Sequence, residues 1–387
     1  MKLRTTSRLL ALLAALALFA AACGSDVADT ATDVVDDAAE VVEDAVDGDD
    51  DDDEAMEDDE EAMEDDDEAM EDGGGGAICE VTDTGGVDDR SFNQLAFEGA
   101  EAAEERFGWE ARVVESVSAT DFDPNIASFV DQGDCNLIVT VGFLLGDATQ
   151  ASAEANPDQN YAIVDFAYDP AIDNVQGLLF QIDQAAFLAG VIAADQTQTG
   201  VVGTFGGIPI PPVTDFMEGF AQGVAYFNAS NGTDVTVLGW DIDAQDGLFT
   251  GNFDSLEDGR AFAENLADEG ADIILPVAGP VGLGSAALVQ ERGLRLIGVD
   301  ADWTQTAAEF DDVILTSILK NIDVAVLDAA TAVHDDTTGP VLLSTLESGG
   351  VGVAPVTNAW NEGTGLDEAL ETISAGIIDG SIATRTG

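Results

Sequence analysis

The sequence predicts an α/β protein with two doubly wound parallel-sheet lobes and a cleft between them. Short apolar runs alternate with amphipathic segments over most of residues 77–387. This alternation is the pattern of βαβ units, which build parallel sheets covered by helices on both faces. The segment holds 311 residues, more than one hydrophobic core usually holds, so we expect two lobes.

The first series of elements begins at residue 77. Its strands are short and apolar, and each is followed by a segment whose apolar side chains recur at helical spacing. The predicted strands are residues 77–81, 111–114, 137–141 and 161–165, and the predicted helices are residues 91–107, 126–132 and 145–154.

A second series of the same kind follows. Its predicted helices are residues 184–196, 213–227, 256–269 and 282–292, and its predicted strands are residues 200–204, 235–238, 272–276, 294–299 and 312–317. A further helix is predicted from just after Lys320 to about residue 335, and a glycine-bounded strand at residues 350–353. We assign residues 77–182 with 318–340 to the first lobe, and residues 183–317 with 341–387 to the second.

Residues 1–22 predict a secretory signal peptide. Three basic residues precede an apolar run that is too short to span a membrane comfortably. Small residues before Cys23, with Gly and Ser after it, resemble a bacterial lipobox, in which the cysteine carries acyl chains that hold the protein to the membrane. Ala20 stands where Leu is commoner. The alternative is ordinary cleavage after Ala22, which would export a free cysteine.

Residues 23–76 predict a disordered acidic tether. This stretch contains 27 Asp and Glu and neither Lys nor Arg, and the motif Glu-Ala-Met-Glu-Asp recurs every seven residues from Glu54. Its apolar surface is too small to offset the entropy of ordering, and its like charges repel. An extended tether that lifts a domain from the membrane is the favoured interpretation, with a cation-binding tail as the alternative.

The remaining chain is also strongly acidic. After the signal and tether, 51 Asp and Glu face eight Lys and Arg. A surface of this charge argues against nucleic-acid binding, since phosphate contacts require basic side chains. It is also compatible with adaptation to high salt. Beyond the signal peptide the chain has one lysine, Lys320, and one histidine, His334.

Cys79 and Cys135 are the two remaining cysteines. An even pair in an exported chain favours a disulfide, and both residues lie at the beginning of strands that could be neighbours in a parallel sheet. Two buried thiols are the alternative.

Loops directly after strands are the places where open α/β sheets bind ligands. The richest loop runs from Asp83 to Asn93: its glycines permit close backbone approach, and Phe92 beside an amide and a carboxylate suits a flat, hydrogen-bonding ligand. The alternative is a turn with a helix cap. Asp165 ends an apolar strand, where a carboxylate is either a ligand contact or a helix cap.

Further candidates lie in the second series. Asp300 stands at a strand tip, where it could contact vicinal hydroxyls, and Lys320 lies at a crossover between lobes, which favours a role in the cleft. Phe216 and Phe220 are four residues apart on one helix, so at least one is expected in the core. Glycines at residues 279–284 could approach a phosphate, but they lack the Walker and Rossmann spacings.

At these residues the sequence resembles the basic membrane protein family. These proteins are lipoprotein receptors of ABC importers, and the studied branch binds purine nucleosides. The sequence VTDTGGVDDRSFNQ at residues 81–94 is similar to the opening signature of the family. The resemblance continues in the same order through residues 138–143, 161–165, 206–211, 216–220, 282–284, 297–300, 317–320 and 349–352.

The resemblance implies a type I periplasmic-binding-protein fold with three crossovers between lobes. The purine would stack between Phe92 and Phe216. It implies further that Asp165 and Asn93 hydrogen-bond the base or its neighbourhood, that Asp300 and Lys320 hold the ribose hydroxyls, and that Asp83 lines the pocket. Such a receptor is a monomer without a cofactor that delivers its ligand to permease and ATPase subunits.

Two loops depart from the family pattern. Residues 279–282 read Gly-Pro-Val-Gly where the family has Gly-Gly-Thr-Gly, and residues 300–303 read Asp-Ala-Asp-Trp where it has Asp-Ser-Asp-Gln. Both are expected to face the sugar, and Trp303 is expected to reshape the pocket there.

Two other classes of function compete with ligand capture. The sequence offers few side chains for enzymatic catalysis. Its one histidine lies in a predicted helix and provides no Ser-His-Asp or Cys-His arrangement, and no cluster of metal ligands is present. A carboxylate-pair nucleoside hydrolase remains the enzymatic alternative. The third class is a surface adhesion or scaffold lipoprotein, in which the acidic tether would be the functional part.

Overall fold

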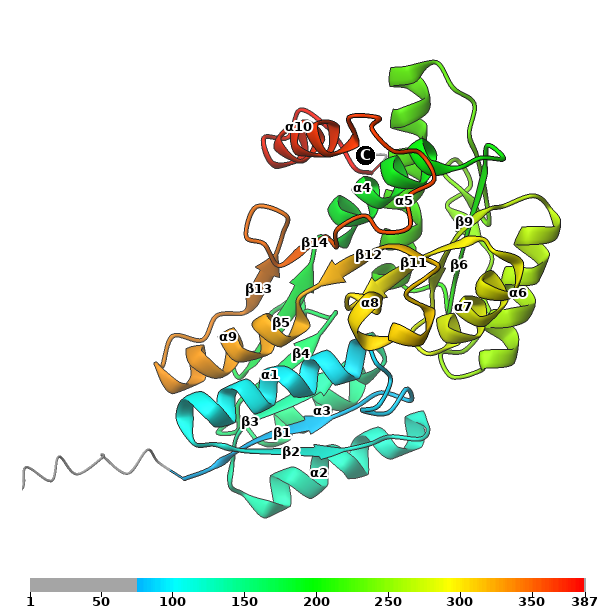
Figure 1. Ribbon diagram of the computed structural model, residues 1–387. Helices are drawn as coiled ribbons and strands as arrows, with labels where there is room; N and C mark the ends of the chain where they lie inside the picture. Colours follow the sequence, from blue (N-terminus) through cyan, green and yellow to red (C-terminus); the bar gives the residue numbers. More distant parts are fainter. Residues whose placement is uncertain (1–74, 386–387) are drawn as a thin grey trace, which may run out of the picture. The chain divides into compact units, whose positions relative to one another are not determined.

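A computed structural model describes residues 75–385 of the chain. The predicted signal peptide, the predicted lipidation site Cys23 and nearly all of the predicted tether lie outside these residues. The described part consists of two α/β lobes, each built on a six-stranded sheet (Figure 1). The predicted α/β class with two doubly wound lobes is therefore confirmed.

The first sheet is parallel throughout, in the strand order β13-β5-β4-β3-β1-β2. Its strands are β1 (Ala77–Val81), β2 (Glu110–Val114), β3 (Cys135–Val141), β4 (Tyr161–Val164), β5 (Val175–Phe180) and β13 (Val341–Ser344). Side chains of the central strands are buried on both faces, as expected of a parallel sheet between helical layers.

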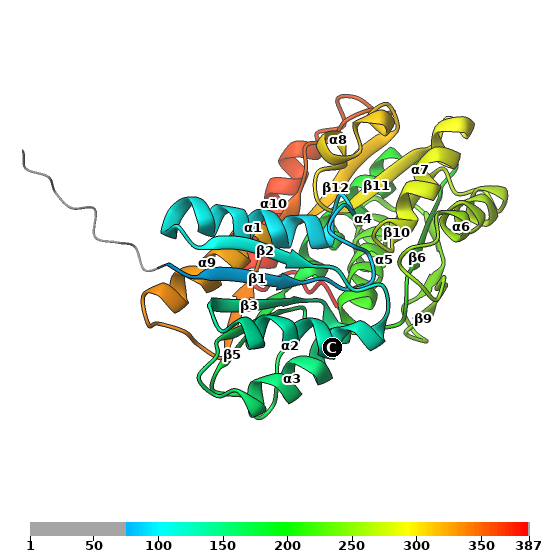
Figure 2. The ribbon, with the colours of Figure 1, turned by 90° about the horizontal axis from the view of Figure 1, so that it is seen from below.

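Four helices cover the first sheet. Helices α1 (Phe92–Phe107) and α9 (Ile322–His334) pack side by side on one face. Helices α2 (Phe122–Gln132) and α3 (Gly146–Ala155) pack together on the other face, as seen from below in Figure 2. Short 3-10 turns precede α2 (Ala119–Asp121) and α3 (Phe143–Leu145).

The second sheet has the order β14-β12-β11-β10-β6-β7, and only β14 runs antiparallel to its neighbour. Its strands are β6 (Val201–Gly206), β7 (Thr236–Leu238), β10 (Ile273–Val277), β11 (Arg295–Asp300), β12 (Ile314–Lys320) and β14 (Val351–Val353). A small hairpin of β8 (Trp240–Asp241) and β9 (Asp246–Gly247) follows β7.

The second sheet is also covered on both faces. Helices α4 (Ile182–Gln196) and α5 (Pro211–Asn231) form one pair, and α6 (Leu256–Asp268) and α7 (Val281–Arg292) form the other. The short helix α8 (Trp303–Thr306) and a 3-10 turn (Ala308–Phe310) follow β11, and α10 (Leu366–Ile378) packs on α4. None of the helices within residues 75–385 is both long and apolar enough to cross a bilayer.

The chain passes between the lobes three times, after β5, after β12 and after β13. The last two passages differ from the predicted lobe boundaries. Residues 318–320 belong to the second sheet, because β12 pairs with β11 and β14 up to Lys320. Residues 341–344 belong to the first sheet, because β13 pairs with β5. Lys320 thus ends a strand, and the helix after it begins at Ile322.

A disulfide joins Cys79 to Cys135, whose Cα atoms are 5.9 Å apart. The two residues lie on the paired strands β1 and β3. The bridge sits on the sheet face covered by α2 and α3, among buried apolar side chains such as Ile126 and Phe129. It therefore ties two neighbouring central strands of the first lobe.

Candidate ligand-binding site

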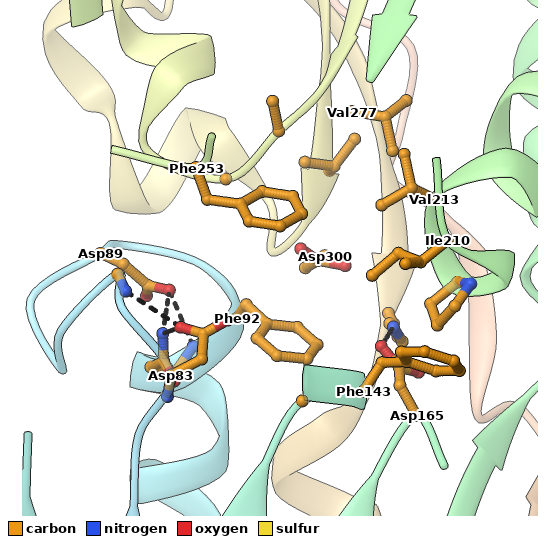
Figure 3. Close-up of a pocket in the computed structure, with 18 of the residues that line it drawn as sticks. Asp83, Asp89, Phe92, Phe143, Asp165, Ile210, Val213, Phe253, Val277 and Asp300 are labelled. Carbon is orange, nitrogen blue, oxygen red and sulfur yellow. Dashed lines mark hydrogen bonds and ion pairs between the residues drawn. The ribbon is translucent and has the colours of Figure 1, made fainter. Parts of the chain in front are cut away.

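A cavity lies between the two lobes, at the carboxyl ends of strands from both sheets (Figure 3). This is the edge at which open α/β sheets bind ligands, because loops of variable chemistry follow the strands there. The structure brings all seven residues predicted from the sequence into its lining: Asp83, Phe92, Asn93, Asp165, Phe216, Asp300 and Lys320.

The loop after β1 is organised by Asn93 and two aspartates. Asn93 Nδ2 donates to Asp83 Oδ1 at 2.8 Å and to Asp89 Oδ2 at 3.1 Å, while Asn93 Oδ1 accepts the Asp83 N–H. Asp83 Oδ1 also accepts the N–H of Gly85 at 3.0 Å. Both N–H groups of the Asn93 amide are therefore engaged in holding the loop.

Asp165 and Asp300 occupy equivalent positions in the two lobes. Asp165 directly follows β4 and Asp300 ends β11, and both adopt left-handed backbone conformations with φ of 65° and 64°. Such conformations are uncommon for residues other than glycine, although Asp tolerates them better than most. The left-handed turn at each strand end places one carboxylate on each side of the cavity.

Lys320 is the buried cation of the site, with only 2% of its side chain exposed. Its Nζ lies 2.5 Å from Asp165 Oδ2, and 4.9, 5.1 and 5.9 Å from the ring centres of Phe92, Phe180 and Phe216. A cation over several aromatic faces is attracted by their quadrupoles. The ammonium group is thereby held at the point where the two lobes meet.

Burial raises the pKa of two aspartates that line the cavity. It raises the pKa of Asp83 to about 6, against the hydrogen bonds from Asn93 and Gly85 that favour the carboxylate. Burial likewise raises the pKa of Asp300 to about 6, although the charge of Lys320 opposes the shift. Near neutral pH both groups are mostly ionised acceptors, and both become protonated just below it.

The apolar wall of the cavity includes residues beyond the seven predicted site residues. Phe92 and Phe216 were expected there, and Phe216 faces the cavity while Phe220 is fully buried in the core. The further wall residues are Phe143, Leu144, Ile210, Pro212, Val213, Phe253 and Val277. In Figure 3, Phe253 reaches into the cavity from the second lobe, opposite Phe92 of the first lobe and beside Asp300.

Phe253 reaches this position because of a glycine. A Cβ on Gly207 would lie 2.2 Å from the Phe253 ring, so only glycine lets the ring approach the loop after β6. The segment before Phe253 is also tied to that loop, since the N–H groups of Thr250 and Gly251 bond to the carbonyls of Gly206 and Gly207. The Gly206-Gly207 pair was the available sequence signal.

Trp303, which was expected to reshape the pocket, is not among the residues that line the cavity. Its side chain is buried, and its Nε1 donates to the carbonyl of Val299 at 2.9 Å. Cβ atoms on Gly298 and Gly282 would each come within 2.7 Å of the indole. The ring therefore packs beneath the β11 loop, and Gly282 serves this packing rather than a phosphate, while Gly279 and Pro280 do border the cavity.

His334 lies far from this chemistry. It is half exposed near the end of α9 and stacks on Phe107, at the opposite end of α1 from Phe92. Within residues 75–385, no group of three or more His, Cys, Asp or Glu is arranged to hold a metal ion. The cavity offers aromatic faces, carboxylate acceptors and one ammonium donor, which suits capture of a flat ligand rich in hydrogen-bond donors.

Two doubly wound lobes with a cavity at their junction are the architecture of a two-lobed ligand-binding protein. The chain belongs to the family of PnrA-like ABC transporter substrate-binding proteins, whose sequence profile matches residues 78–377. The family resemblance read from the motifs is therefore confirmed. Members of this family are substrate-binding proteins of ABC transporters rather than enzymes, and they act with a small-molecule ligand and with permease and ATPase subunits.

Individual relatives agree with this assignment. An ABC transporter nucleoside-binding protein, BmpA of Lactococcus lactis, is 30% identical over 322 residues, which cover 78% of this chain and 87% of the relative. Basic membrane protein A of Borreliella burgdorferi is 32% identical over 306 residues, covering 77% and 84% of the two chains. Among relatives in archaea is an uncharacterized lipoprotein of Pyrococcus abyssi, 32% identical over 285 residues, covering 71% and 68%.

Solved structures show the same fold. An ABC transporter solute-binding protein from Aeropyrum pernix aligns with a TM-score of 0.69 and 29% identity over 79% of this chain and 92% of its own. A solute-binding protein from Conexibacter woesei aligns with a TM-score of 0.62 and 21% identity, over 79% and 98% of the two chains. The predicted type I periplasmic-binding fold is thus confirmed.

Proposed function

We propose that this protein is an extracytoplasmic lipoprotein that captures purine nucleosides for an ABC importer. The observation that carries the proposal is the pairing, in one cavity, of aromatic walls with Asp300 and the buried Lys320. A purine needs aromatic faces to stack on, and a ribose needs acceptors and a donor for its hydroxyls. The nucleoside-binding relative from Lactococcus lactis supports the same ligand class.

The residues of the cavity divide into two functions. Phe92 and Phe216 contact the faces of the base, and Phe253 supplies a further aromatic surface from the second lobe. Asp165 hydrogen-bonds the polar edge of the base, while Asp300 and Lys320 hold the ribose hydroxyls. These assignments carry over what the family resemblance implies, and they are supported by the place of these side chains in the lining of the cavity.

Asp83 and Asn93 take a more indirect part. Asp83 keeps one carboxylate oxygen toward the cavity, near Gly142 and the Phe92 ring, while its other oxygen is bound by Asn93 and Gly85. Asn93 therefore acts on the ligand through the position of Asp83 and of the loop. The family resemblance implied that Asn93 hydrogen-bonds the base or its neighbourhood, and in this proposal the neighbourhood is Asp83.

The anchor and the tether complete the proposal. Cys23 carries the lipid, residues 24–76 hold the lobes away from the membrane, and the protein works as a monomer with its permease and ATPase. The relatives named as lipoproteins and basic membrane proteins support this location. Mass spectrometry of the protein purified from membranes would show the mass of acyl chains on a mature N-terminal cysteine, and a free Cys23 thiol would contradict the anchor.

A thermal-shift panel tests the ligand class. The full chain is heated with adenosine, guanosine, inosine, free bases, sugars and amino acids in turn. Ligand that binds only the folded state adds about 2.7 kcal/mol of stability at one hundred times its Kd, so nucleosides should raise the melting temperature and the other classes should not. No response to any nucleoside would contradict the proposal and favour an adhesion or scaffold function.

A second assay separates capture from hydrolysis. The same nucleosides are incubated with the protein and the mixture is separated by chromatography. Intact nucleoside after prolonged incubation is expected. Release of free base, abolished by Asp300→Asn, would instead show a carboxylate-dependent nucleoside hydrolase.

A further inference from the structure

Ser91 occupies the N-cap position of α1, yet its hydroxyl makes no capping hydrogen bond. An N-cap serine ordinarily accepts an N–H from the first turn of its helix. Here Asp89 does so, accepting the N–H groups of Asn93 at 2.8 Å and Gln94 at 3.1 Å. The start of α1 is satisfied without Ser91, which leaves this hydroxyl available for another partner.

The Ser91 hydroxyl reaches across to the second lobe. Although Ser91 belongs to the first lobe and is 1% exposed, its Oγ lies 3.0 Å from the carbonyl oxygen of Val299 and 3.2 Å from Asp300 Oδ2. The Val299 carbonyl already accepts the Ala301 N–H at 2.8 Å and the Trp303 Nε1–H at 2.9 Å. The Ser91 hydroxyl is thus the donor in both contacts, shared between the crowded Val299 carbonyl and the Asp300 carboxylate.

The preceding residue, Arg90, makes a second contact with the same lobe. Its guanidinium donates to the carboxylate of Glu309, in the 3-10 turn after α8. Arg90 adopts a left-handed backbone conformation with φ of 62°, which is unfavourable for a non-glycine residue. Two adjacent residues of the first lobe are thus bound to two separate points of the second lobe.

We propose that Arg90 and Ser91 form a clasp that holds the lobes closed over the ligand, with Ser91 as a positioning residue for the Asp300 carboxylate. The clasp directly precedes Phe92, so the same segment carries the closing contacts and one wall of the cavity. The role of Asp300 toward a ligand rests on the proposed function. The clasp itself is a property of the chain with or without ligand.

Hydrogen exchange of the full, ligand-free chain tests the clasp directly. Peptides covering residues 82–96 and 296–310 are followed by mass spectrometry in wild type, Ser91→Ala and Arg90→Gln. Loss of one hydrogen bond or one exposed ion pair should speed exchange in both peptides by roughly three- to ten-fold. In addition, hydrogen exchange in Arg90→Glu should be as fast as in Arg90→Gln. Combining Arg90→Glu with Glu309→Arg reverses the ion pair and should restore slow exchange.

Matched controls separate the clasp from general loss of stability. Ser285→Ala removes a buried hydroxyl that donates to the Gly259 carbonyl within the second lobe, and Arg260→Gln breaks an ion pair to Glu291 of similar exposure. These variants should leave both peptides at the wild-type rate. If the clasp variants exchange no faster than these controls, or if the reversed pair fails to restore protection, the proposal is overturned.

Titration with inosine tests the positioning of Asp300. Ser91→Ala should bind about ten-fold more weakly. The pH below which binding is lost should also be higher in Ser91→Ala, because the Ser91 hydrogen bond lowers the pKa of Asp300. The charge of Lys320 lowers the same pKa, and the charges of Asp165 and Asp89 raise it. Wild-type affinity and an unchanged pH dependence would overturn the positioning role while nucleoside binding stands. If wild type binds no nucleoside, the proposed function fails, and hydrogen exchange alone decides the clasp.

Discussion

Lys320 Nζ lies 2.5 Å from Asp165 Oδ2, and this ion pair joins the two lobes within the cavity. Lys320 ends β12 of the second sheet, whereas Asp165 follows β4 of the first. Only 2% and 8% of the two side chains are exposed, so each charge depends on the other for compensation. The sole lysine of the described chain therefore joins the two lobes and also lines the cavity proposed to hold the ligand.

Replacing Lys320 by methionine should destabilise the fold strongly. The substitution leaves the Asp165 carboxylate buried without its partner, which typically costs about 3–5 kcal/mol. The double variant Lys320→Met/Asp165→Asn removes both charges and should recover much of that loss. Urea denaturation of the three proteins measures the effect. A single variant as stable as wild type would show that the pair contributes nothing to the closed arrangement.

The aromatic walls should contribute separately to affinity. Phe253→Ala and Phe216→Ala each remove a ring from the cavity. Because a base–aromatic contact is worth about 1–3 kcal/mol, each variant should bind nucleoside roughly 10- to 100-fold more weakly. Phe262, which packs on Phe205 away from the cavity, provides the control Phe262→Ala. Calorimetric titration compares the variants. Wild-type affinity in Phe253→Ala would remove this residue from the site.

Stability and binding should respond to pH in opposite directions. Burial raises the pKa of Glu80, Asp83, Asp215 and Asp300 above their ordinary values, to about 6 for the three aspartates. The folded state therefore binds protons more tightly than the unfolded chain, whose aspartates titrate near about 3.9. The resulting stabilisation is complete below the unfolded pKa and is lost as the pH rises through 6.

Thermal denaturation should accordingly give a higher melting temperature at pH 5 than at pH 7.5. Nucleoside affinity should fall over the same interval, because protonated Asp300 is a poorer acceptor for ribose hydroxyls. Parallel melting and titration series at constant ionic strength measure both trends. A melting temperature that falls on acidification to pH 5 would contradict the assigned acidities.

Removing the disulfide should affect stability but not the site. The Cys79–Cys135 bridge spans a sequence separation of 56 residues. Closing a loop of that length is worth about 4 kcal/mol in the chain-entropy account. The variant Cys79→Ala/Cys135→Ala should therefore unfold at lower denaturant while its ligand affinity stays within two-fold of wild type. A large loss of affinity without loss of stability would show that the bridge shapes the cavity.

Much of the fold was predictable because most of the sheet strands are short, apolar and followed by a helix. The strands β5 and β13 escaped prediction. β5 contains Gly177, whose missing side chain allows the backbone of Phe166 to approach closely. β13 exposes Val341 and Leu343, and only its pairing with β5 shows that it belongs to the first sheet.

The candidate site was predictable where a residue lies at or just beyond the carboxyl end of a strand, as Asp83, Asp165 and Asp300 do. Phe253 escaped because it follows a small hairpin, and its place depends on a tertiary contact with Gly207. The partners of Asn93 could not be predicted, because the two aspartates that engage its amide come together only through the folded loop.

Calorimetric titration of the full chain with inosine tests the central claim most directly, when run beside Phe92→Ala and Asp300→Asn. We predict saturable one-to-one binding to wild type. Both variants should bind at least ten-fold more weakly while melting within a few degrees of wild type, since each loses a ligand contact rather than a core side chain. The absence of heat with inosine, adenosine and guanosine, or equal affinity in all three proteins, would contradict nucleoside capture in this cavity.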